Sequence, residues 1–342
     1  MPKIITMNKL FVCLLFIFIS IHVPGKVHAQ QTEVYQLEKK INIPGDGGYD
    51  YLAIDDVNRK LYVSHGTSVN IIDLNTEQIV GEIKDMTGVH GIAIANDMGK
   101  GFISDGKANA VVVFDLKSYN KIATIPISGK DPDAILYDAY SRQVFTFNGD
   151  SKNASVVDPV SLKQSGTIDL GAGPEFAVSD GKGIIYNNLE DKNSLHVIDA
   201  KALKVVRNYP LSPCGGPTGL ALDKAHQRLF TVCRQNKGMS VVDINNGKVV
   251  KTLPIGAGVD AVAYDPGTSL IICSNGDGTA TIFKQASADD YTFIQTLNTQ
   301  YRAKTMALDL KTHKIYLSAP EFEKGTRKII PGTFNVLVFK LK

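Results

Sequence analysis

The sequence lacks helical periodicity: no window places apolar residues at i, i+3, i+4 and i+7 across three turns. It also lacks HExxH, a CxxCH haem-attachment site, a glycine-rich phosphate loop and a GxSxG elbow. The absent periodicity argues against a helical protein. The absent motifs leave zincin, c-type haem, P-loop and α/β-hydrolase chemistry without support.

An excess of charge of one sign is also missing. The chain has 37 Lys and Arg against 34 Asp and Glu, and Lys3, Lys9 and Lys26 lie in its first 29 residues. The remaining chain has a formal charge near zero and no long basic run. There is no electrostatic argument for a nucleic-acid surface, so we expect no nucleic-acid partner.

Long apolar runs are limited to one, from Leu10 to Val23. Two lysines precede this run and Val27-His28-Ala29 follows it, which is the layout of a secretory signal cleaved after Ala29. The alternative is a membrane anchor, but the run is shorter than the ~20 residues of a spanning helix. We therefore expect a signal peptide over 1–29 and an exported single domain over 30–342. It would be periplasmic or secreted and have no membrane span.

Cysteine is scarce, with Cys214, Cys233 and Cys273 in the expected mature chain. Export permits a disulfide without requiring one, and the odd count leaves at least one thiol unpaired. Cys214 and Cys233 fall on one end of the same repeat unit, so they form either a disulfide or two unpaired thiols. Cys273 lies inside an apolar strand and is expected in the core.

What the sequence does have is a repeated phrase, an apolar run closing on an aspartate. It ends at Asp73, Asp115, Asp158, Asp199 and Asp243, and two later copies end at Lys284 and Lys340. The aspartates are 41 to 44 residues apart, and each unit reads as four short strands separated by turn residues. A period of about 40–45 residues with four strands per unit indicates a β-propeller. We count seven units and predict an all-β, seven-bladed propeller.

The last unit lacks an outer strand, because the chain stops soon after the strand that ends in Lys340. An unassigned strand-like segment, residues 34–43, precedes the first unit. We predict that this segment completes the last blade and closes the ring, which leaves only short protected strand edges. The last unit also carries an insertion over 320–333, which we expect to form a flap over one face.

The second strand of each unit ends in a variant of a Tyr-Val-Thr-Asn phrase. The variants include Tyr62-Val-Ser-His65, Phe102-Ile-Ser-Asp105, Phe145-Thr-Phe-Asn148 and Ile272-Cys-Ser-Asn275, and Pro217-Thr-Gly-Leu-Ala221 gives a typical unit opening. The chain thus resembles the YVTN family of β-propellers, a secreted or periplasmic group that includes YncE-like proteins. The resemblance covers essentially the whole expected mature chain. It implies the fold strongly and the function hardly at all.

Two sets of polar residues are expected to meet around the central funnel. The entry ring precedes each first strand and comprises Asp50, His90, Asp133, Glu175, Thr218, Asp260 and Thr305. The strand-end ring closes each second strand and comprises His65, Asp105, Asn148, Asn188, Cys233, Asn275 and Ala319. As candidate ligand-binding residues we take the acidic, histidine and asparagine members of both rings.

Carboxylate and amide oxygens suit Ca²⁺ or Mg²⁺, and His65 or His90 could act as a base near neutral pH. The alternative is that both rings cap strand ends and line a water-filled channel. Aspartates after the first and third strands, such as Asp55 and Asp73, are expected to be structural, because Asp hydrogen-bonds its own turn.

The sequence is therefore interpreted as an exported binding or scaffold protein. Its funnel face would bind a small polar ligand, a cation or a protein partner. The alternative is a divalent-cation-dependent lyase or hydrolase that acts on a cell-envelope sugar or lactone at the same funnel. Whether the chain is an enzyme, and whether Ca²⁺ or Mg²⁺ is its cofactor, stays open at this point.

Overall fold

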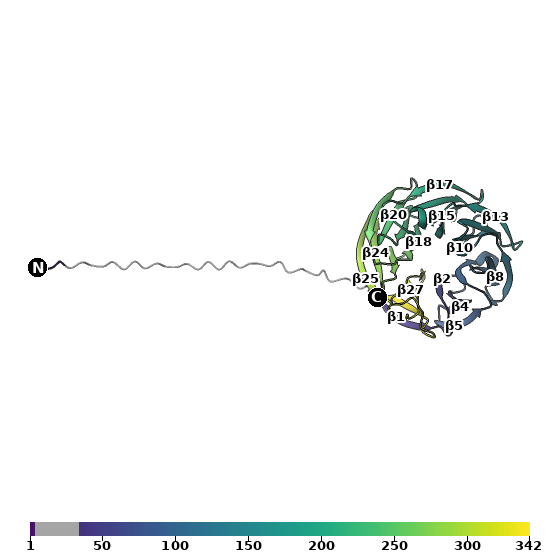
Figure 1. The fold of residues 1–342 in the computed structure, drawn as a ribbon, viewed down its shortest axis with the longest axis horizontal. Helices are drawn as coiled ribbons and strands as arrows, with labels where there is room; N and C mark the ends of the chain where they lie inside the picture. The colour runs from purple at the N-terminus through teal and green to yellow at the C-terminus, as the bar shows by residue number, and fades with distance from the viewer. Residues whose placement is uncertain (4–33) are drawn as a thin grey trace. The chain divides into compact units, whose positions relative to one another are not determined.

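The computed structural model describes residues 1–3 and 34–342, so most of the expected signal segment, 1–29, lies outside the described residues. Residues 34–342 form seven four-stranded antiparallel sheets arranged as blades around a ring (Figure 1). The predicted all-β, seven-bladed propeller is confirmed.

Each blade runs from an inner strand at the central channel to an outer strand at the rim. Blades 1 to 3 comprise β2 (Tyr49–Asp55), β3 (Lys60–His65), β4 (Ser68–Asp73), β5 (Gln78–Ile83), β6 (Val89–Ala95), β7 (Lys100–Asp105), β8 (Ala110–Asp115), β9 (Lys121–Pro126), β10 (Pro132–Asp138), β11 (Gln143–Asn148), β12 (Asn153–Asp158) and β13 (Lys163–Asp169). Blades 4 to 6 comprise β14 (Pro174–Ser179), β15 (Ile184–Leu189), β16 (Ser194–Asp199), β17 (Lys204–Pro210), β18 (Pro217–Asp223), β19 (Arg228–Cys233), β20 (Gly238–Asp243), β21 (Val249–Pro254), β22 (Ala261–Asp265), β23 (Leu270–Asn275), β24 (Thr279–Ser287) and β25 (Asp290–Asn298). Blade 7 comprises β26 (Met306–Asp309), β27 (Lys314–Ala319), β28 (Asn335–Leu341) and β1 (Tyr35–Asn42).

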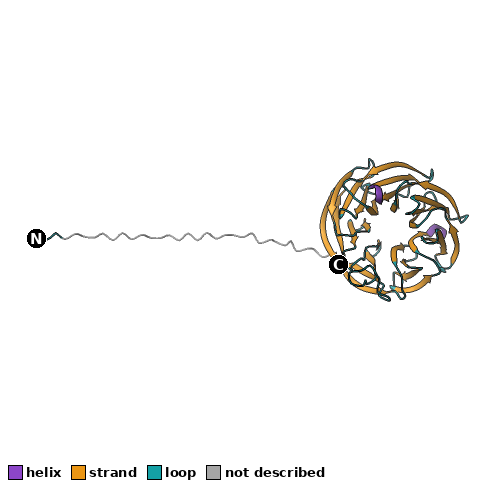
Figure 2. Ribbon diagram, in the orientation of Figure 1, coloured by secondary structure: helices purple, strands orange, loops and turns teal. Residues whose placement is uncertain are grey.

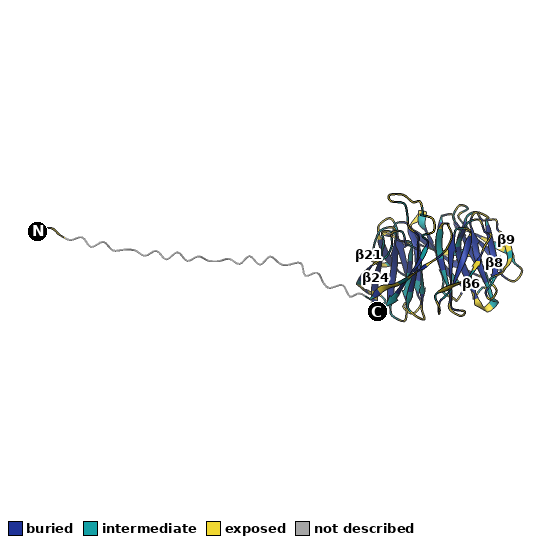
Figure 3. Cartoon of the chain, turned by 90° about the horizontal axis from the view of Figure 1, so that it is seen from below, coloured by how far each residue is buried: buried dark blue, intermediate teal, exposed yellow. Residues whose placement is uncertain are grey.

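The two middle strands of each blade are buried on both faces, because every blade packs between two neighbours. In β3, for example, Leu61 and Tyr62 point to opposite faces and both are fully buried. The outer strands are mostly exposed or half-buried, as the yellow and teal rim in Figure 3 shows. The near-continuous apolar runs of the middle strands follow from this two-sided packing.

The ring closes between the first and last described strands. β1 pairs antiparallel with β28, from Tyr35 opposite Leu341 to Asn42 opposite Asn335. Gln295 of blade 6 secures this closure: its Oε1 accepts the backbone N–H of Tyr35 at 2.8 Å, and its Nε2 donates to the carbonyl of Tyr35 at 2.9 Å. The prediction that residues 34–43 complete the last blade is confirmed.

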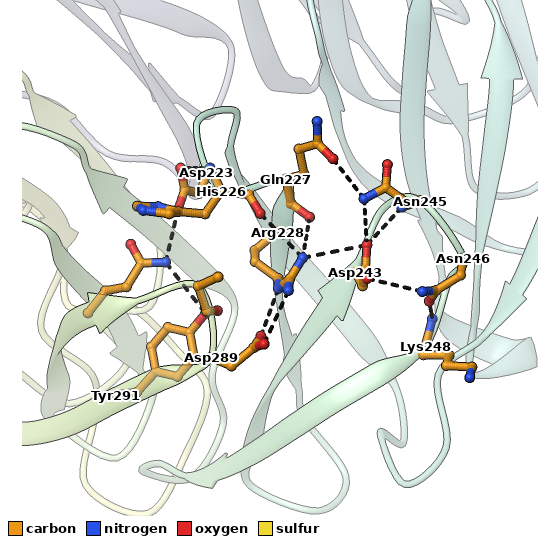
Figure 4. Close-up of polar contacts among 12 residues, drawn as sticks. Asp223, His226, Gln227, Arg228, Asp243, Asn245, Asn246, Lys248, Asp289 and Tyr291 are labelled. Atoms are coloured by element: carbon orange, nitrogen blue, oxygen red, sulfur yellow. Dashed lines mark hydrogen bonds and ion pairs between the residues drawn. The ribbon is translucent and has the colours of Figure 1, made fainter.

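The repeated aspartates cap turns, as predicted. Asp73 accepts the backbone N–H groups of Asn75 and Thr76 at 2.9 Å, and Asp55 does the same for Val57 and Asn58. Figure 4 shows such a turn tied to its surroundings, where Arg228 lies between the turn aspartate Asp243 and Asp289 of the next blade. These residues lie at the end of the blades opposite the start of the inner strands.

The expected flap, residues 320–333, contains a short bridge between Phe322 and Ile329. The Phe322 ring lies against Tyr49 and Tyr301, with centroids at 6.3 and 6.1 Å, and the Arg302 guanidinium lies 5.2 Å from its centre. The flap is thereby anchored to the end of the blades where the inner strands begin.

The cysteine question left open by the sequence has a definite answer. Cys214 and Cys233 form a disulfide, and Cys273 is free and buried, as expected. Within 34–342 the helical elements are two short 3₁₀ turns, η1 (Asn96–Met98) and η2 (Glu190–Lys192), drawn purple in Figure 2. Across the described part of the chain, no helix has the length and apolar character to cross a membrane.

Candidate functional site

A β-bulge aims the entry ring at the channel. The register of the first two strands shifts between Tyr49 and Leu52, and it shifts at the same place in blades 2, 3, 4 and 5. Each bulge leaves unpaired the residue that belongs to the entry ring, so its side chain leaves the pleat of the sheet. Asp50, His90, Asp133 and Glu175 reach the mouth of the channel for this reason.

Small polar residues fix the backbone of these bulges. Ser64 Oγ accepts the N–H of Asp50 at 2.9 Å, and Ser104 Oγ accepts the N–H of Gly91 at 2.8 Å. Ser104 also donates to the carbonyl of Asp133 in the next blade at 2.5 Å. A Cβ added at Gly91 would lie 3.0 Å from that same carbonyl. Glycine therefore allows the close approach of blades 2 and 3 that brings His90 to Asp133.

His90 is the centre of a cluster of acids. Its Nδ1 lies 2.7 Å from Asp50 Oδ2 and 3.6 Å from Asp133 Oδ1, and its Nε2 lies 3.9 Å from Asp131 Oδ1. One ligand atom each from Asp50, His90 and Asp133 falls within 4.8 Å of the others. The three residues come from three successive blades.

Two acids on this side of the funnel, Asp133 and Glu175, hold protons more tightly than usual. Burial, the Asp50 charge and other acids raise the pKa of Asp133 to about 7, although His90 opposes the shift. Burial, Asp133 and Glu190 raise the pKa of Glu175 to about 9. Burial alone would lower the pKa of His90, but the hydrogen bond to Asp50 and the nearby carboxylates raise it to about 9. Crowded carboxylates without enough cations behave in this way.

The opposite side of the funnel is basic. Asp260 forms ion pairs with both Arg234 and Lys304, and Arg234 Nη1 also lies 2.8 Å from Glu190 Oε1. Burial opposes the charges of Arg234 and Lys304, but the nearby acids, with Asp260 foremost, together raise the pKa of both groups. Asp260 thus has two cationic partners, whereas Asp133 has His90 alone and Glu175 has no ion pair among the described residues.

Two aromatic rings close the channel beside the acids. Tyr51 follows Asp50 and Phe176 follows Glu175, and their ring centroids are 5.6 Å apart although they belong to blades 1 and 4. Burial and the charge of Asp133 raise the pKa of Tyr51 well above its usual range, so the phenol stays neutral. The two rings place apolar surface near the acids, and charge–charge interactions are stronger in such a low-dielectric environment than in water.

Two cavities of opposite charge open at this mouth. The acidic cavity has a volume of about 450 Å³ and is lined by Asp131, Asp133, Gly149, Asp150, Gly173, Pro174, Glu175, Glu190, Asp191 and Gln235. The basic cavity has a volume of about 500 Å³ and is lined by Arg234, Ala257, Gly258, Gly276, Asp277, Tyr301, Arg302, Lys304 and Arg327.

The strand-end ring lies at the same end of the blades, but its side chains are buried inside them. Asp105 is 3 % exposed and accepts hydrogen bonds from Gly88 N at 2.8 Å and from Thr87 N and Oγ1. His65 is 5 % exposed, lies on Phe334 with centroids 4.6 Å apart, and leaves Nε2 without a partner among the described residues. Burial lowers the pKa of His65, so its ring is neutral at pH 7.

The side chains of the three asparagines in this ring also form hydrogen bonds within the protein. Asn148 and Asn275 donate to side-chain oxygens of the neighbouring strand, at 2.8 to 3.0 Å. Asn188 donates to the carbonyl of Thr218 in blade 5 at 2.8 Å. One assignment needs correction, because β15 ends at Leu189, which occupies the position of His65 in β3. Asn188 instead occupies the position of Ser64.

Of the ten candidate residues, the structure brings four together at the acidic side, Asp50, His90, Asp133 and Glu175, and places Asp260 on the basic side. The sequence analysis missed Asp131, Glu190, Arg234, Arg302, Lys304 and Arg327. Arg234 directly follows Cys233 and Lys304 directly precedes Thr305, so adjacency to a ring position was the available signal. Glu190 follows Leu189 as Arg234 follows Cys233, so it occupies the position equivalent to Arg234. Asp131, Arg302 and Arg327 lie on connecting loops or the flap, outside the ring positions.

No family model matches the chain. Over 227 residues it is 22% identical to Antigen Lp49 of Leptospira interrogans serogroup Icterohaemorrhagiae serovar copenhageni (strain Fiocruz L1-130), which covers 62% of this chain and 49% of that protein. The chain thus spans about half the length of this curated relative.

Among solved structures, the fold is similar to a chain of Kuenenia stuttgartiensis hydrazine synthase, with a TM-score of 0.69, 15% identity and coverage of 82% of this chain and 94% of that chain. A chain of a mitotic checkpoint complex matches with a TM-score of 0.74, 13% identity and coverage of 97% and 99%. Such low identities establish the fold alone. The chain is therefore a seven-bladed propeller with a distant relative in this leptospiral antigen.

Proposed function

We propose that this chain is an exported binding protein whose acidic cavity holds a cationic group, either a divalent cation or the ammonium group of a small polar ligand. The observation that carries the proposal is the cluster of Asp50, His90 and Asp133 beside Glu175. Four blades supply these side chains, and the bulges and serine hydrogen bonds described above fix their backbone.

The charge state of the cluster supports a cationic ligand. Burial and the neighbouring acids raise the pKa values of Asp133 and Glu175, and His90 opposes this shift at Asp133, whereas Asp260 has two cationic partners. A bound cation would take the place of those protons. Oxygen ligands suit Ca²⁺ and Mg²⁺, and one imidazole does not prevent their binding.

The test is calorimetric titration of the metal-free protein with CaCl₂, MgCl₂ and ethanolamine at pH 8. At least one probe should bind, and Asp133→Asn should weaken its affinity by about tenfold or more, as loss of a supporting ligand does at metal sites. Asp289→Asn is the matched control, because that carboxylate is exposed at the other end of the blades. If none of the three probes binds, or if both variants behave alike, the proposal is wrong.

A second candidate function is a divalent-cation-dependent lyase or hydrolase that acts on a cell-envelope sugar or lactone. The three-residue cluster favours it, since three protein ligands leave positions open for water and substrate, as in catalytic metal sites. Elemental analysis of the purified protein, followed by turnover assays on lactones and envelope sugars, separates the two functions. Metal-dependent turnover that Asp50→Asn and His90→Gln abolish would establish the enzyme.

The YVTN-type phrases support membership of the YncE-like propellers, and the signal-like first 29 residues support export to the periplasm or the medium. N-terminal sequencing of the protein recovered outside the cytoplasm should begin at Gln30. A protein that keeps its first residues and stays in the cytoplasm would contradict the export proposal.

A further inference from the structure

The basic cavity opposite the acidic cluster has no role in cation binding. Four cationic side chains line it, namely Arg234, Arg302, Lys304 and Arg327. They come from three separate places: Arg234 follows β19, Arg302 and Lys304 lie in the loop before β26, and Arg327 lies in the flap. Their convergence on one cavity of about 500 Å³ therefore comes from the tertiary fold and from no local charge run.

The positive charge in this cavity is only partly neutralised. Asp260 is shared between Arg234 and Lys304, and Glu190 also pairs with Arg234. Within the described part of the chain, neither Arg302 nor Arg327 has an ion pair. The Nε atom of Arg302 is buried without a hydrogen-bond acceptor, so its charge is not compensated within the blade.

One acid, Asp277, also lines the cavity, but its oxygens are occupied. Oδ2 accepts the backbone N–H of Ala257 at 2.7 Å, and Oδ1 accepts the hydroxyl of Thr279 at 2.6 Å. The remaining wall is glycine-rich, with Gly258 and Gly276 so close that a Cβ on Gly276 would lie 2.9 Å from the carbonyl of Gly258. Small residues leave room for a ligand to approach the guanidinium groups.

The flap contacts one of these cations and supplies another. Phe322 lies under the Arg302 guanidinium at 5.2 Å, which orients that group and screens it from solvent. The same flap supplies Arg327, which also lines a smaller cavity of about 230 Å³ beside Phe334. An arginine fixed by stacking loses less freedom when it binds an anion, and guanidinium groups match carboxylate and phosphate in geometry.

We propose that the basic cavity is an anion subsite for a phosphate or carboxylate group. Resting on the proposed function, we further infer that the natural ligand is a small zwitterion. Its ammonium end would lie at Asp133 and Glu175, and its anionic end at Arg302 and Arg327. Asp260 and Arg234 form the boundary between the two subsites, since Arg234 contacts both Asp260 and Glu190 of the acidic wall.

The experiment titrates the full chain with inorganic phosphate at constant ionic strength, with and without the substitutions. Phosphate should bind, and Arg327→Gln should weaken it about tenfold, as expected for loss of one charge-assisted contact. Lys324→Gln is the matched control, because Lys324 is exposed on the same flap and does not line the cavity. Arg302→Lys keeps the charge but loses the planar group, and should also weaken phosphate binding.

A second arm uses O-phosphoethanolamine, which carries an ammonium group and a phosphate group on one small molecule. It should bind more tightly than phosphate or ethanolamine alone, and Asp133→Asn should reduce its affinity without changing that of phosphate. If phosphate binds but O-phosphoethanolamine binds no more tightly, the zwitterionic ligand is ruled out and the anion subsite is retained. Absence of phosphate binding up to about 10 mM, or equal binding by Arg327→Gln and the parent chain, would overturn the anion subsite whatever the cation titrations give.

Discussion

Tyr51 and Phe176 face each other across the central channel with ring centroids 5.6 Å apart, and each directly follows an acid of the entry ring. Besides burial, the charges of Asp133 and Glu175 help to raise the pKa of Tyr51, so its ring lies near these acids. We infer that the two rings limit the access of water to Asp133 and Glu175, whose burial raises their pKa values.

Tyr51→Ala should increase the access of water to Asp133 and Glu175. We expect the pKa of Glu175 to fall toward its usual range and the free energy of unfolding to decrease by about 2 kcal/mol, below the full cost of a core aromatic because the ring is only half-buried. Carboxyl titration by NMR and urea unfolding measure the two effects. Tyr51→Phe, which keeps the ring, should change neither by much.

Stability should depend on pH in the direction set by the cluster. Asp133, Glu175 and His90 all bind protons more tightly in the native state than in the unfolded chain. The two acids therefore contribute stability that is complete below pH ~4, and His90 contributes stability that is complete below pH ~6.5; both contributions are lost as the pH rises through about 7 to 9.

The free energy of unfolding of the metal-free protein should accordingly fall between pH 6 and pH 9. Glu175→Gln removes one of the groups and should make the fall shallower, whereas Asp289→Asn should leave it unchanged. A slope that is the same in the parent chain and in Glu175→Gln would contradict the raised pKa of Glu175.

Asp105 should behave as a structural residue. Asp105→Ala leaves the N–H groups of Thr87 and Gly88 without their acceptor, which should cost about 2–3 kcal/mol of stability. Chemical denaturation measures this loss, and titration with the cationic probes should give an affinity within about twofold of the parent chain. A large loss of affinity for the cationic probes in a folded Asp105→Ala variant would contradict this structural role and would indicate that the strand-end ring takes part in binding.

The disulfide should stabilise blade 5. Cys214 and Cys233 are separated by 19 residues, so replacing both with serine should cost about 3 kcal/mol through the greater freedom of the unfolded chain. Thermal unfolding of the double variant with and without reductant measures this contribution. The parent chain should lose stability in reductant, and the double variant should not respond to it.

Much of the architecture could be predicted because a repeat is visible in the sequence. The aspartate of each third strand fixed the period, and the unmatched segment 34–43 then had only one place to pair. The entry ring could be predicted for the same reason, since Asp50, His90 and Asp133 occupy equivalent positions. The period carries this information because every blade uses the same backbone.

The rest of the site could not be predicted from the repeat. Residue type does not tell whether a polar side chain at a strand end points to solvent, so Asp105 and His65 were indistinguishable from Asp133 and His90. The β-bulge directs Asp133 and His90 into the channel but is absent at Asp105 and His65, and no residue type in the sequence marks where it occurs. Arg302 and Arg327 lie in a connection and an insertion, where no repeat-equivalent position exists and only the tertiary fold brings them to Lys304.

The pairing of β1 with β28 sets an order of events during synthesis. About 300 residues must follow β1 before its partner exists, which takes ~15–60 s at ~5–20 residues per second. Throughout that interval blade 1 lacks blade 7, which packs against one of its faces in the folded protein, so apolar side chains such as Leu61 and Val63 stay open to other chains. The apolar face of blade 1 is therefore covered only after full-length synthesis, and incomplete chains are expected to aggregate more readily than the finished protein.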